Sequence, residues 1–223
     1  MFIDLNIPVP AHLDRKEREK LILILYQLSH SDDQVIVALN HTIDKYPIKQ
    51  LPKIEAPITF DNLKILTRIT IETDTPIEES HLEELQSIYD LVSIRTSNRQ
   101  VFEQASQSNH IDIISLSCVE RISFDLNPIY VQKAIENHIY FELCYSPGIR
   151  DNTFRGYVFQ VGSILVSLTK GDHLIISSEA ENVSEVRSPY DVYYFAKSFG
   201  LPNDIAKFTY CKNSYSLLTH KSL

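Results

Sequence analysis

Residues 173–201, HLIISSEAENVSEVRSPYDVYYFAKSFGL, form one strand–loop–helix unit of the kind that the rest of the chain repeats. The apolar run 174–176 is short enough for a buried strand. An acidic loop follows and leads to Arg187, immediately before Ser188-Pro189. The first turn of a helix accepts Pro189 because an N–H there would have no partner. Residues 191–199 then predict a helix that ends at Gly200 and Pro202. Arg187 therefore lies on a strand-to-helix connection, where functional residues concentrate in α/β folds.

The same alternation of strand and helix continues through the chain. The predicted strands cover residues 2–5, 34–39, 63–72, 89–94, 111–116, 138–145 and 173–176, with a doubtful eighth at 214–219. The clearest helix, 153–169, has Phe154, Val158, Val161 and Leu165 along one face, which we expect to face the core. Near-continuous apolar strands are typical of a parallel sheet. We therefore predict an α/β fold, one domain over residues 1–223: a compact TIM-type barrel, regular or irregular, of seven or eight mostly parallel strands.

Five blocks of the chain resemble one known family. They are FIDLNIP (2–8), VALNHTID (37–44), LKILTRITIE (63–72), LCYSPGIRDNTFRGY (143–157) and ISSEAENVSEVRSPYDVYYFAKSFGL (176–201). In this order they resemble the ribonuclease P/MRP 30-kDa protein subunit family, and together they extend over nearly the whole chain. One departure is Ser188, where the family usually has glycine in an Arg-Gly-Pro-Tyr-Asp segment.

The resemblance implies the same barrel fold and a role without catalysis of its own. The RNA component of nuclear ribonuclease P and ribonuclease MRP would cleave phosphodiesters, in precursor tRNA 5′ leader removal and in rRNA processing. This chain would bind that RNA and other protein subunits, among them a small ferredoxin-like subunit, and would meet precursor tRNA indirectly. The blocks are closer to eukaryotic members than to archaeal ones, which implies the nucleus and nucleolus.

Composition agrees with a globular protein but not with simple RNA binding. A hydrophobic content of 43% and a charged content of 22% allow a sizeable core. No apolar run is long enough to span a bilayer, and no signal pattern opens the chain. The three cysteines, Cys118, Cys144 and Cys211, are set among apolar residues and read as core thiols. The net charge of −8 argues against autonomous RNA binding, because phosphate neutralisation dominates such affinity.

The competing interpretation is a divergent metal-dependent phosphoesterase of the polymerase-and-histidinol-phosphatase barrel type. Those enzymes carry His-x-His at the first strand, where this chain has Asp4 and Asn6, and an amide is a poor substitute for imidazole on a transition metal. No two of the eight histidines have ligand spacing, and no nucleophile elbow or glycine-rich phosphate loop is present. Asp4 is the best lone acid/base candidate, against a role in capping or pairing. We therefore predict no catalytic residue, no metal and no cofactor.

The strand ends offer cations instead. Arg68 lies inside the third predicted strand, so it must pair with an acid or project toward the barrel mouth. Arg95 and Arg99 follow the fourth strand, Arg150 the sixth and Arg187 the seventh. Because all these strands end on one side, the five arginines could form one surface that binds RNA or a partner protein. The alternative is local salt bridging, for Arg187 with the acidic loop before it.

One long connection, residues 41–61, adds three lysines, Lys45, Lys49 and Lys53. It is predicted to be either a solvated loop or an insertion that faces RNA or a partner.

Overall fold

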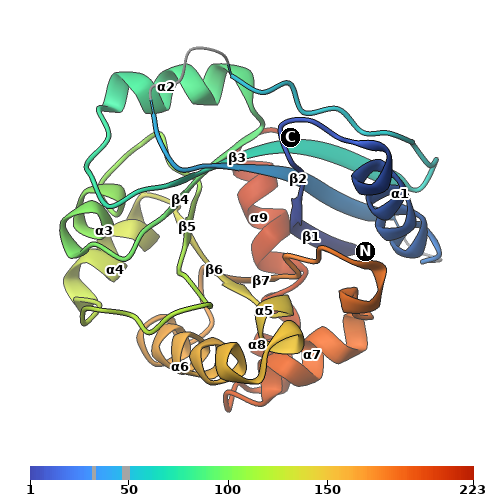
Figure 1. Ribbon diagram of the computed structural model, residues 1–223. Helices are drawn as coiled ribbons and strands as arrows, with labels where there is room; N and C mark the ends of the chain where they lie inside the picture. The colour runs from blue at the N-terminus through green and yellow to red at the C-terminus, as the bar shows by residue number, and fades with distance from the viewer. Residues whose placement is uncertain (32–33, 47–50) are drawn as a thin grey trace.

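The computed structural model describes residues 1–31, 34–46 and 51–223. Within them, seven parallel strands form one sheet in chain order, β1 to β7. They are β1 (Phe2–Pro8), β2 (Val35–Ile43), β3 (Leu63–Glu72), β4 (Leu91–Arg95), β5 (Ile113–Ser115), β6 (Tyr140–Cys144) and β7 (Leu174–Ser177). Figure 1 looks down the ring of strands, with α1–α8 around it and α9 across the middle. The prediction of a parallel, TIM-type barrel is confirmed.

Several helices begin at a residue whose side chain caps the first turn. They are α1 (Arg15–Ser29), α2 (Glu79–Ile88), α3 (Arg99–Ala105), α4 (Pro128–Glu136), α5 (Ser146–Arg150), α6 (Asn152–Thr169), α7 (Pro189–Lys197), α8 (Asn203–Phe208) and α9 (Lys212–His220). Asp14 and Asp151 cap α1 and α6. Ser188 caps α7 reciprocally with Asp191, so the serine that replaces the family's glycine has a structural use.

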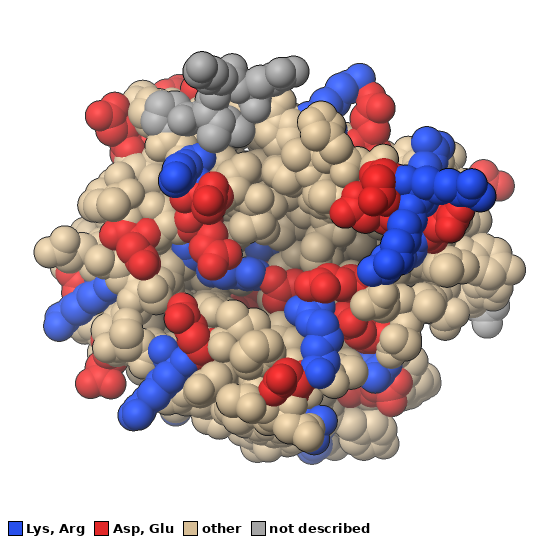
Figure 2. Space-filling view, in the orientation of Figure 1, with Lys and Arg blue, Asp and Glu red and all other residues tan. Residues whose placement is uncertain are grey.

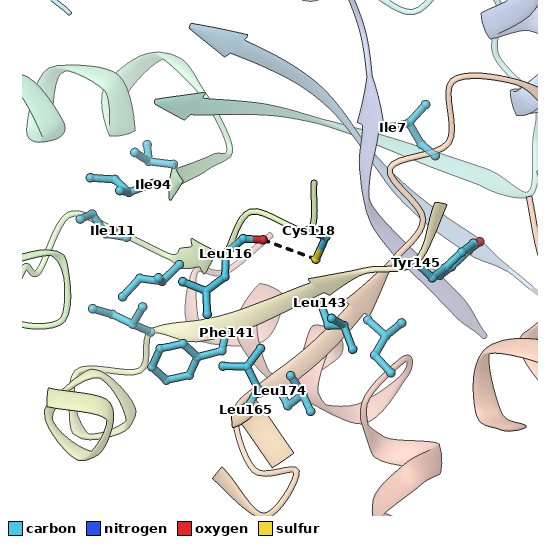
Figure 3. Packing of buried hydrophobic residues seen from close by; sticks show 14 of the residues in the cluster. Ile7, Ile94, Ile111, Leu116, Cys118, Phe141, Leu143, Tyr145, Leu165 and Leu174 are labelled. Atoms are coloured by element: carbon cyan, nitrogen blue, oxygen red, sulfur yellow. Dashed lines mark hydrogen bonds between the residues drawn. The ribbon is translucent and has the colours of Figure 1, made fainter. Parts of the chain in front are cut away.

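The main core lies between the strands and the surrounding helices. On α6, Val158, Val161 and Leu165 are buried, while Phe154 at the start of the predicted stripe is only half-buried. Leu165 lies beside Leu143 and Leu174 of β6 and β7 in Figure 3. Cys118 and Cys144 are buried free thiols, as expected, and Cys211 is half-buried.

The ring closes between β1 and β7 without a strand ladder. Instead, the backbone N–H of Glu179 donates to the Asn6 carbonyl at 3.0 Å, and the N–H of Ser178 donates to Asp4 Oδ1 at 3.0 Å. The predicted eighth strand at 214–219 is wrong, because that segment belongs to α9. A short apolar run does not distinguish strand from helix, and here Leu217 and Leu218 pack against the inside of the barrel.

Inside the barrel, the inward-facing side chains form two layers, one apolar and one polar. An apolar layer comes first, closed by Leu217 and Leu218 of α9; its strand members are Ile3, Leu5, Ala38, Leu66, Leu91, Ile113, Tyr140 and Ile175. A polar layer follows toward the strand ends: Asn6, Asn40, Arg68, Ser93, Ser115, Glu142 and Ser177, all buried. On β2 to β7 each polar member stands two positions after its apolar neighbour, since alternate residues of a strand share a face.

The connection 41–61 is described in part. Residues 41–43 belong to β2, and Lys49 lies outside the described residues. Lys53 is exposed and pairs with Glu55. The Tyr89 hydroxyl donates to the Pro52 carbonyl at 2.7 Å, which fixes this part of the connection against the start of β4. Among the described residues, no helix is long and apolar enough to cross a membrane.

Candidate functional site

The centre of the polar layer is a buried ion pair between Arg68 on β3 and Glu142 on β6. The two guanidinium ends donate to the two carboxylate oxygens at 2.6 and 2.7 Å, and both side chains are 0% exposed. Arg68 also donates to the Leu5 carbonyl at 2.7 Å and to Ser93 Oγ at 3.0 Å. Pairing with an acid was one of the two alternatives for Arg68. Its inclusion among the RNA-facing arginines is a misassignment for this structure, because no atom of it reaches the surface.

Amide side chains complete this layer. Thr70 Oγ1 donates to Asn40 Oδ1 at 2.8 Å, Asn40 Nδ2 donates to Asn6 Oδ1 at 2.8 Å, and Asn6 Nδ2 donates to Glu142 Oε2 at 3.2 Å. Asn6 stands where the phosphoesterases carry a metal-binding histidine. Here it relays hydrogen bonds around the inside of the ring, so its polar atoms are already occupied.

Glu142 is held in its ionised form. Burial alone raises the pKa of this carboxyl, but the charge and hydrogen bonds of Arg68 outweigh it and lower the pKa to about 2. Such a carboxylate is a weak base at neutral pH, and it is inaccessible to a substrate. The ion pair therefore orders the interior and offers no general base.

Asp4 caps backbone groups at the seam of the barrel. Its Oδ1 accepts from the N–H groups of Asn6 and Ser178, and the residue is 2% exposed. Burial raises the pKa of the Asp4 carboxyl to about 6, against the lowering effect of Ser178. Of the two predicted roles, the structure shows capping, since β1 and β7 are joined through this side chain.

Arg95 lies at the rim of a cavity of about 520 Å³ beyond the ends of β3 and β4. It pairs with Glu179 at 2.6 Å, and Glu72 lies 3.8 Å away. Burial opposes its charge, but Glu179 outweighs that effect and raises the pKa of the guanidinium. Asp44, Asp74 and Glu120 also line the cavity, with Arg95 and Lys45 as its basic residues. An acidic lining repels phosphate, so this cavity is a poor RNA site.

Arg150, at the end of α5, is paired with the acidic loop that follows β7. Its Nη1 lies 3.0 Å from Glu185 and 3.1 Å from Glu181. Arg99 lies apart from the mouth at the start of α3, where it pairs with Glu103 one turn later at 2.8 Å. In Figure 2, Lys and Arg side chains are interspersed with Asp and Glu across this face. The structure thus does not bring the predicted arginines together as one cationic surface.

Arg187 is the exception among these arginines. Its guanidinium donates to the carbonyls of Ser184 and Val186, at 2.8 and 3.1 Å, and its backbone N–H donates to the Tyr145 hydroxyl. Within the described chain, no carboxylate lies within 4.0 Å of the Arg187 charge. The acidic loop, which was the alternative local partner for Arg187, is paired with Arg95 and Arg150 instead. Arg187 is half-buried, and its charge is not neutralised by an acid.

Two functional partners were missed in the sequence. Glu142 is a single acid within the apolar strand FELC, and Glu179 directly follows the Ser177-Ser178 pair. An isolated acid inside an apolar strand requires a buried cation just as Arg68 requires an acid. That shared requirement was the available signal, although it does not identify which residues pair.

The donor set of the barrel does not fit a metal ion. Among the described residues, no three His, Cys, Asp or Glu side chains are grouped so that they could hold one. At the inner end of the mouth, Glu142 is occupied by Arg68 and Asp4 by two backbone N–H groups. The metal-dependent phosphoesterase alternative therefore has no support.

Several known proteins of similar sequence are named as ribonuclease P subunits. Mouse ribonuclease P protein subunit p30 is 31% identical, with 98% of this chain and 85% of that protein covered. The probable ribonuclease P protein subunit 3 of Schizosaccharomyces pombe is 28% identical over 99% of this chain and 93% of its own. The fold resembles a chain in a cryo-EM structure of archaeal ribonuclease P with mature tRNA, with a TM-score of 0.70, 17% identity, and 99% and 91% coverage. The model of the family RNase P subunit p30 matches residues 1–223. The chain belongs to this family.

Proposed function

We propose that this chain is a noncatalytic protein subunit of ribonuclease P and of ribonuclease MRP, in which the RNA component cleaves precursor tRNA and precursor rRNA. Support comes from the relatives, which are named as ribonuclease P subunits, and from Saccharomyces cerevisiae ribonuclease P/MRP protein subunit RPP1, 24% identical over 92% of this chain. The proposal includes the nucleus and nucleolus as its location. Its partners are the RNA and other subunits, including a small ferredoxin-like one.

One observation carries the noncatalytic role. The interior of the barrel, where strand-end side chains perform chemistry in TIM-type enzymes, is filled by the closed network around Arg68 and Glu142. Every carboxylate there already has a partner in the chain. A scaffold can use such an interior, because the barrel then offers its outer surface to other molecules.

The outer surface beside Arg187 supports assembly. A largely apolar cavity of about 270 Å³ lies between α5, α6 and α7, bordered by Arg155 and Arg187. Phe159 is 41% exposed at this cavity, and Tyr190 and Tyr194, one turn apart on α7, are 78% and 68% exposed. Aromatic and arginine side chains are the residues most enriched at protein interfaces. We place the contact of Arg187 with RNA or a sister subunit here.

The test is incorporation into the particle. The wild-type chain, Arg187→Ala and the control Arg15→Ala, which removes a 93%-exposed arginine from α1, are expressed with an affinity tag in cells depleted of the endogenous protein. We expect wild type and Arg15→Ala to co-purify with the RNA components of ribonuclease P and ribonuclease MRP, and with activity that cleaves precursor tRNA. Arg187→Ala should recover less of both RNAs. The proposal would be contradicted if the purified chain alone cleaved precursor tRNA, or if active particles did not contain the chain.

A further inference from the structure

A second cluster of titratable side chains lies at the opposite end of the barrel from the mouth. A cavity of about 530 Å³ is bordered by His138, Lys170, His173, Lys212 and His220. His138 and His173 stand just before β6 and β7, so the cavity opens at the N-terminal ends of these strands. None of these residues belongs to the arginine sites described above.

The backbone around this cavity is unusual. His138, Lys170 and His173 have φ values of 58°, 57° and 50°, in the left-handed region. Only two other non-glycine residues of the described chain do so, Glu179 and Ser222. A side chain makes this conformation costly, whereas glycine adopts it freely. Three residues thus keep their side chains where glycine fits better, and all three border one cavity. Retained strain of this kind concentrates at ligand sites.

His138 shows the contrast most clearly. It follows α4 in the position where helices usually end with glycine, and the next N–H, of Ile139, donates back to the Ala134 carbonyl at 2.8 Å. Its exposed ring contacts that of His220 in a tilted arrangement, with ring centres 4.3 Å apart. Packing into the core therefore does not explain the side chain.

His173 adds unsatisfied polar atoms. Its ring stacks on Tyr140 at 4.6 Å. Both ring nitrogens are buried without a hydrogen bond of normal geometry to any described residue, although Asp172 Oδ1 lies 3.1 Å from Nδ1. A buried polar atom without a hydrogen bond is rare, so it calls for a functional explanation.

The start of α9 supplies further donors. Lys212 and Ser216 of its first turns line the cavity, together with Asn213, whose amide already donates to the Gly171 and Leu174 carbonyls. No described side chain caps this helix. An uncapped helix N-terminus presents free N–H groups and a positive dipole end to an anion. In the described chain neither Lys170 nor Lys212 pairs with a carboxylate, and Lys212 Nζ lies 4.4 Å from the centre of the Phe208 ring. Among the described residues that line the cavity, Asp172 is the only acid, whereas Lys170 and Lys212 are both basic.

We propose that this cavity binds a phosphate group and that, in the assembled particle, the phosphate is a phosphodiester of an RNA strand. The cationic and imidazole donors match phosphate oxygens, and the exposed rings offer faces on which a neighbouring base can stack. The choice of RNA rests on the proposed function, whereas the choice of phosphate rests on the cavity alone.

The test compares inorganic phosphate with a short single-stranded RNA on the purified full chain. Phosphate binding is followed through the histidine ring resonances, and RNA binding through fluorescence anisotropy at fixed salt. The variants are Lys212→Ala, Lys170→Gly and His138→Gly. Ser222→Gly is the matched control, because it relieves the same left-handed strain at a residue that does not line the cavity.

We expect phosphate to shift the resonances of His138, His173 and His220, and RNA to compete with it. Each cavity variant should weaken RNA binding about tenfold or more, the loss of one charge-assisted hydrogen bond. Both cavity glycine variants should melt no earlier than wild type, and Ser222→Gly should bind RNA normally.

Other results overturn the inference. Glycine variants that melt earlier and bind RNA as wild type does would show that these side chains serve packing. Phosphate binding without RNA binding would remove the RNA assignment, and binding of neither would remove the site. The proposed function is judged separately, because co-purification with the RNA does not depend on this cavity alone.

Discussion

The two layers inside the barrel use the same strands, two residues apart, and stabilise the fold in different ways. The apolar layer, including Leu91 and the α9 residues Leu217 and Leu218, relies on burial, which has no preferred direction. The polar layer relies on directed contacts, and each buried group there depends on a particular partner. A large-to-small substitution in the apolar layer leaves a cavity, whereas removal of one ion-pair partner in the polar layer leaves an unpaired buried charge. This difference can be tested from the most costly change to the least.

The largest effect is expected from breaking the buried ion pair. Arg68→Met or Glu142→Gln alone should lower the free energy of unfolding by about 3–5 kcal/mol, because each leaves an uncompensated charge in the interior. Urea denaturation measures the loss. The double variant Arg68→Met/Glu142→Leu should recover much of it, since neither charge then remains. A double-variant loss equal to the sum of the two single losses would contradict this account, because it would show that the two residues stabilise the fold independently of each other.

A change of similar size but different origin is expected in the apolar layer. Leu91→Ala should cost about 2–5 kcal/mol through lost burial and the cavity left behind. Leu91 is fully buried, and the matched control Leu91→Ile keeps its volume and should cost less than about 1.5 kcal/mol. Denaturation at pH 5 and at pH 7 should show the same loss from Leu91→Ala, because no charge is involved. A loss that changes with pH would mean that the two layers are coupled.

Asp4 at the seam and Glu142 in the polar layer should give the stability of the fold opposite pH dependences. The folded pKa of Asp4, about 6, lies above its ordinary value of 3.8, so Asp4 stabilises the fold less as pH rises between these values. Glu142 has a folded pKa of about 2 against an ordinary 4.5, so its contribution is lost as pH falls through that range. Asp4→Asn should therefore raise stability above pH 6 by about 1–3 kcal/mol and flatten the curve between pH 4 and 6. Thermal melts of both proteins across pH 3–8 measure this, and an unchanged slope would contradict the assignment.

The smallest effects are expected at the mouth. Arg150→Ala should lower stability by about 1 kcal/mol, because Arg150 and Glu181 are partly exposed. Glu185 is buried, but it keeps its hydrogen bonds from the Glu181 N–H and the Asn182 amide. Arg187→Ala should leave the melting temperature of the free chain nearly unchanged, since no described carboxylate pairs with it. Differential scanning calorimetry of both variants compares them directly. If Arg187→Ala melts markedly earlier than Arg150→Ala, Arg187 is a structural residue and its place at an interface is wrong.

Local features of the fold could be predicted because they depend on near neighbours. The strand–helix alternation, the caps at Asp14 and Asp151, and the helix that opens at Pro189 all follow from residues a few positions apart. The prediction of a strand at 214–219 was wrong because the apolar residues of this segment contact the apolar layer inside the barrel. The local sequence pattern does not show that contact.

The site was harder to predict because its pairs are distant in the sequence. Arg68 and Glu142 are 74 positions apart, so the need for an acid was evident but its identity was not. The acids that precede Arg187 form ion pairs with Arg95 and Arg150, which lie next to them only in the folded barrel. Which arginines contact RNA stays a prediction.

The seam between β1 and β7 has a consequence for how the chain is made. The ring cannot close at the first strand until Ser178 and Glu179 have been synthesised. Leu217 and Leu218, which cover the apolar layer, are synthesised later still. At about 5–20 residues per second, synthesis of the intervening chain takes roughly 10–40 seconds. During that time the growing sheet has an open edge and an uncovered apolar layer. We therefore expect the nascent chain to depend on chaperones until its last helix has left the ribosome.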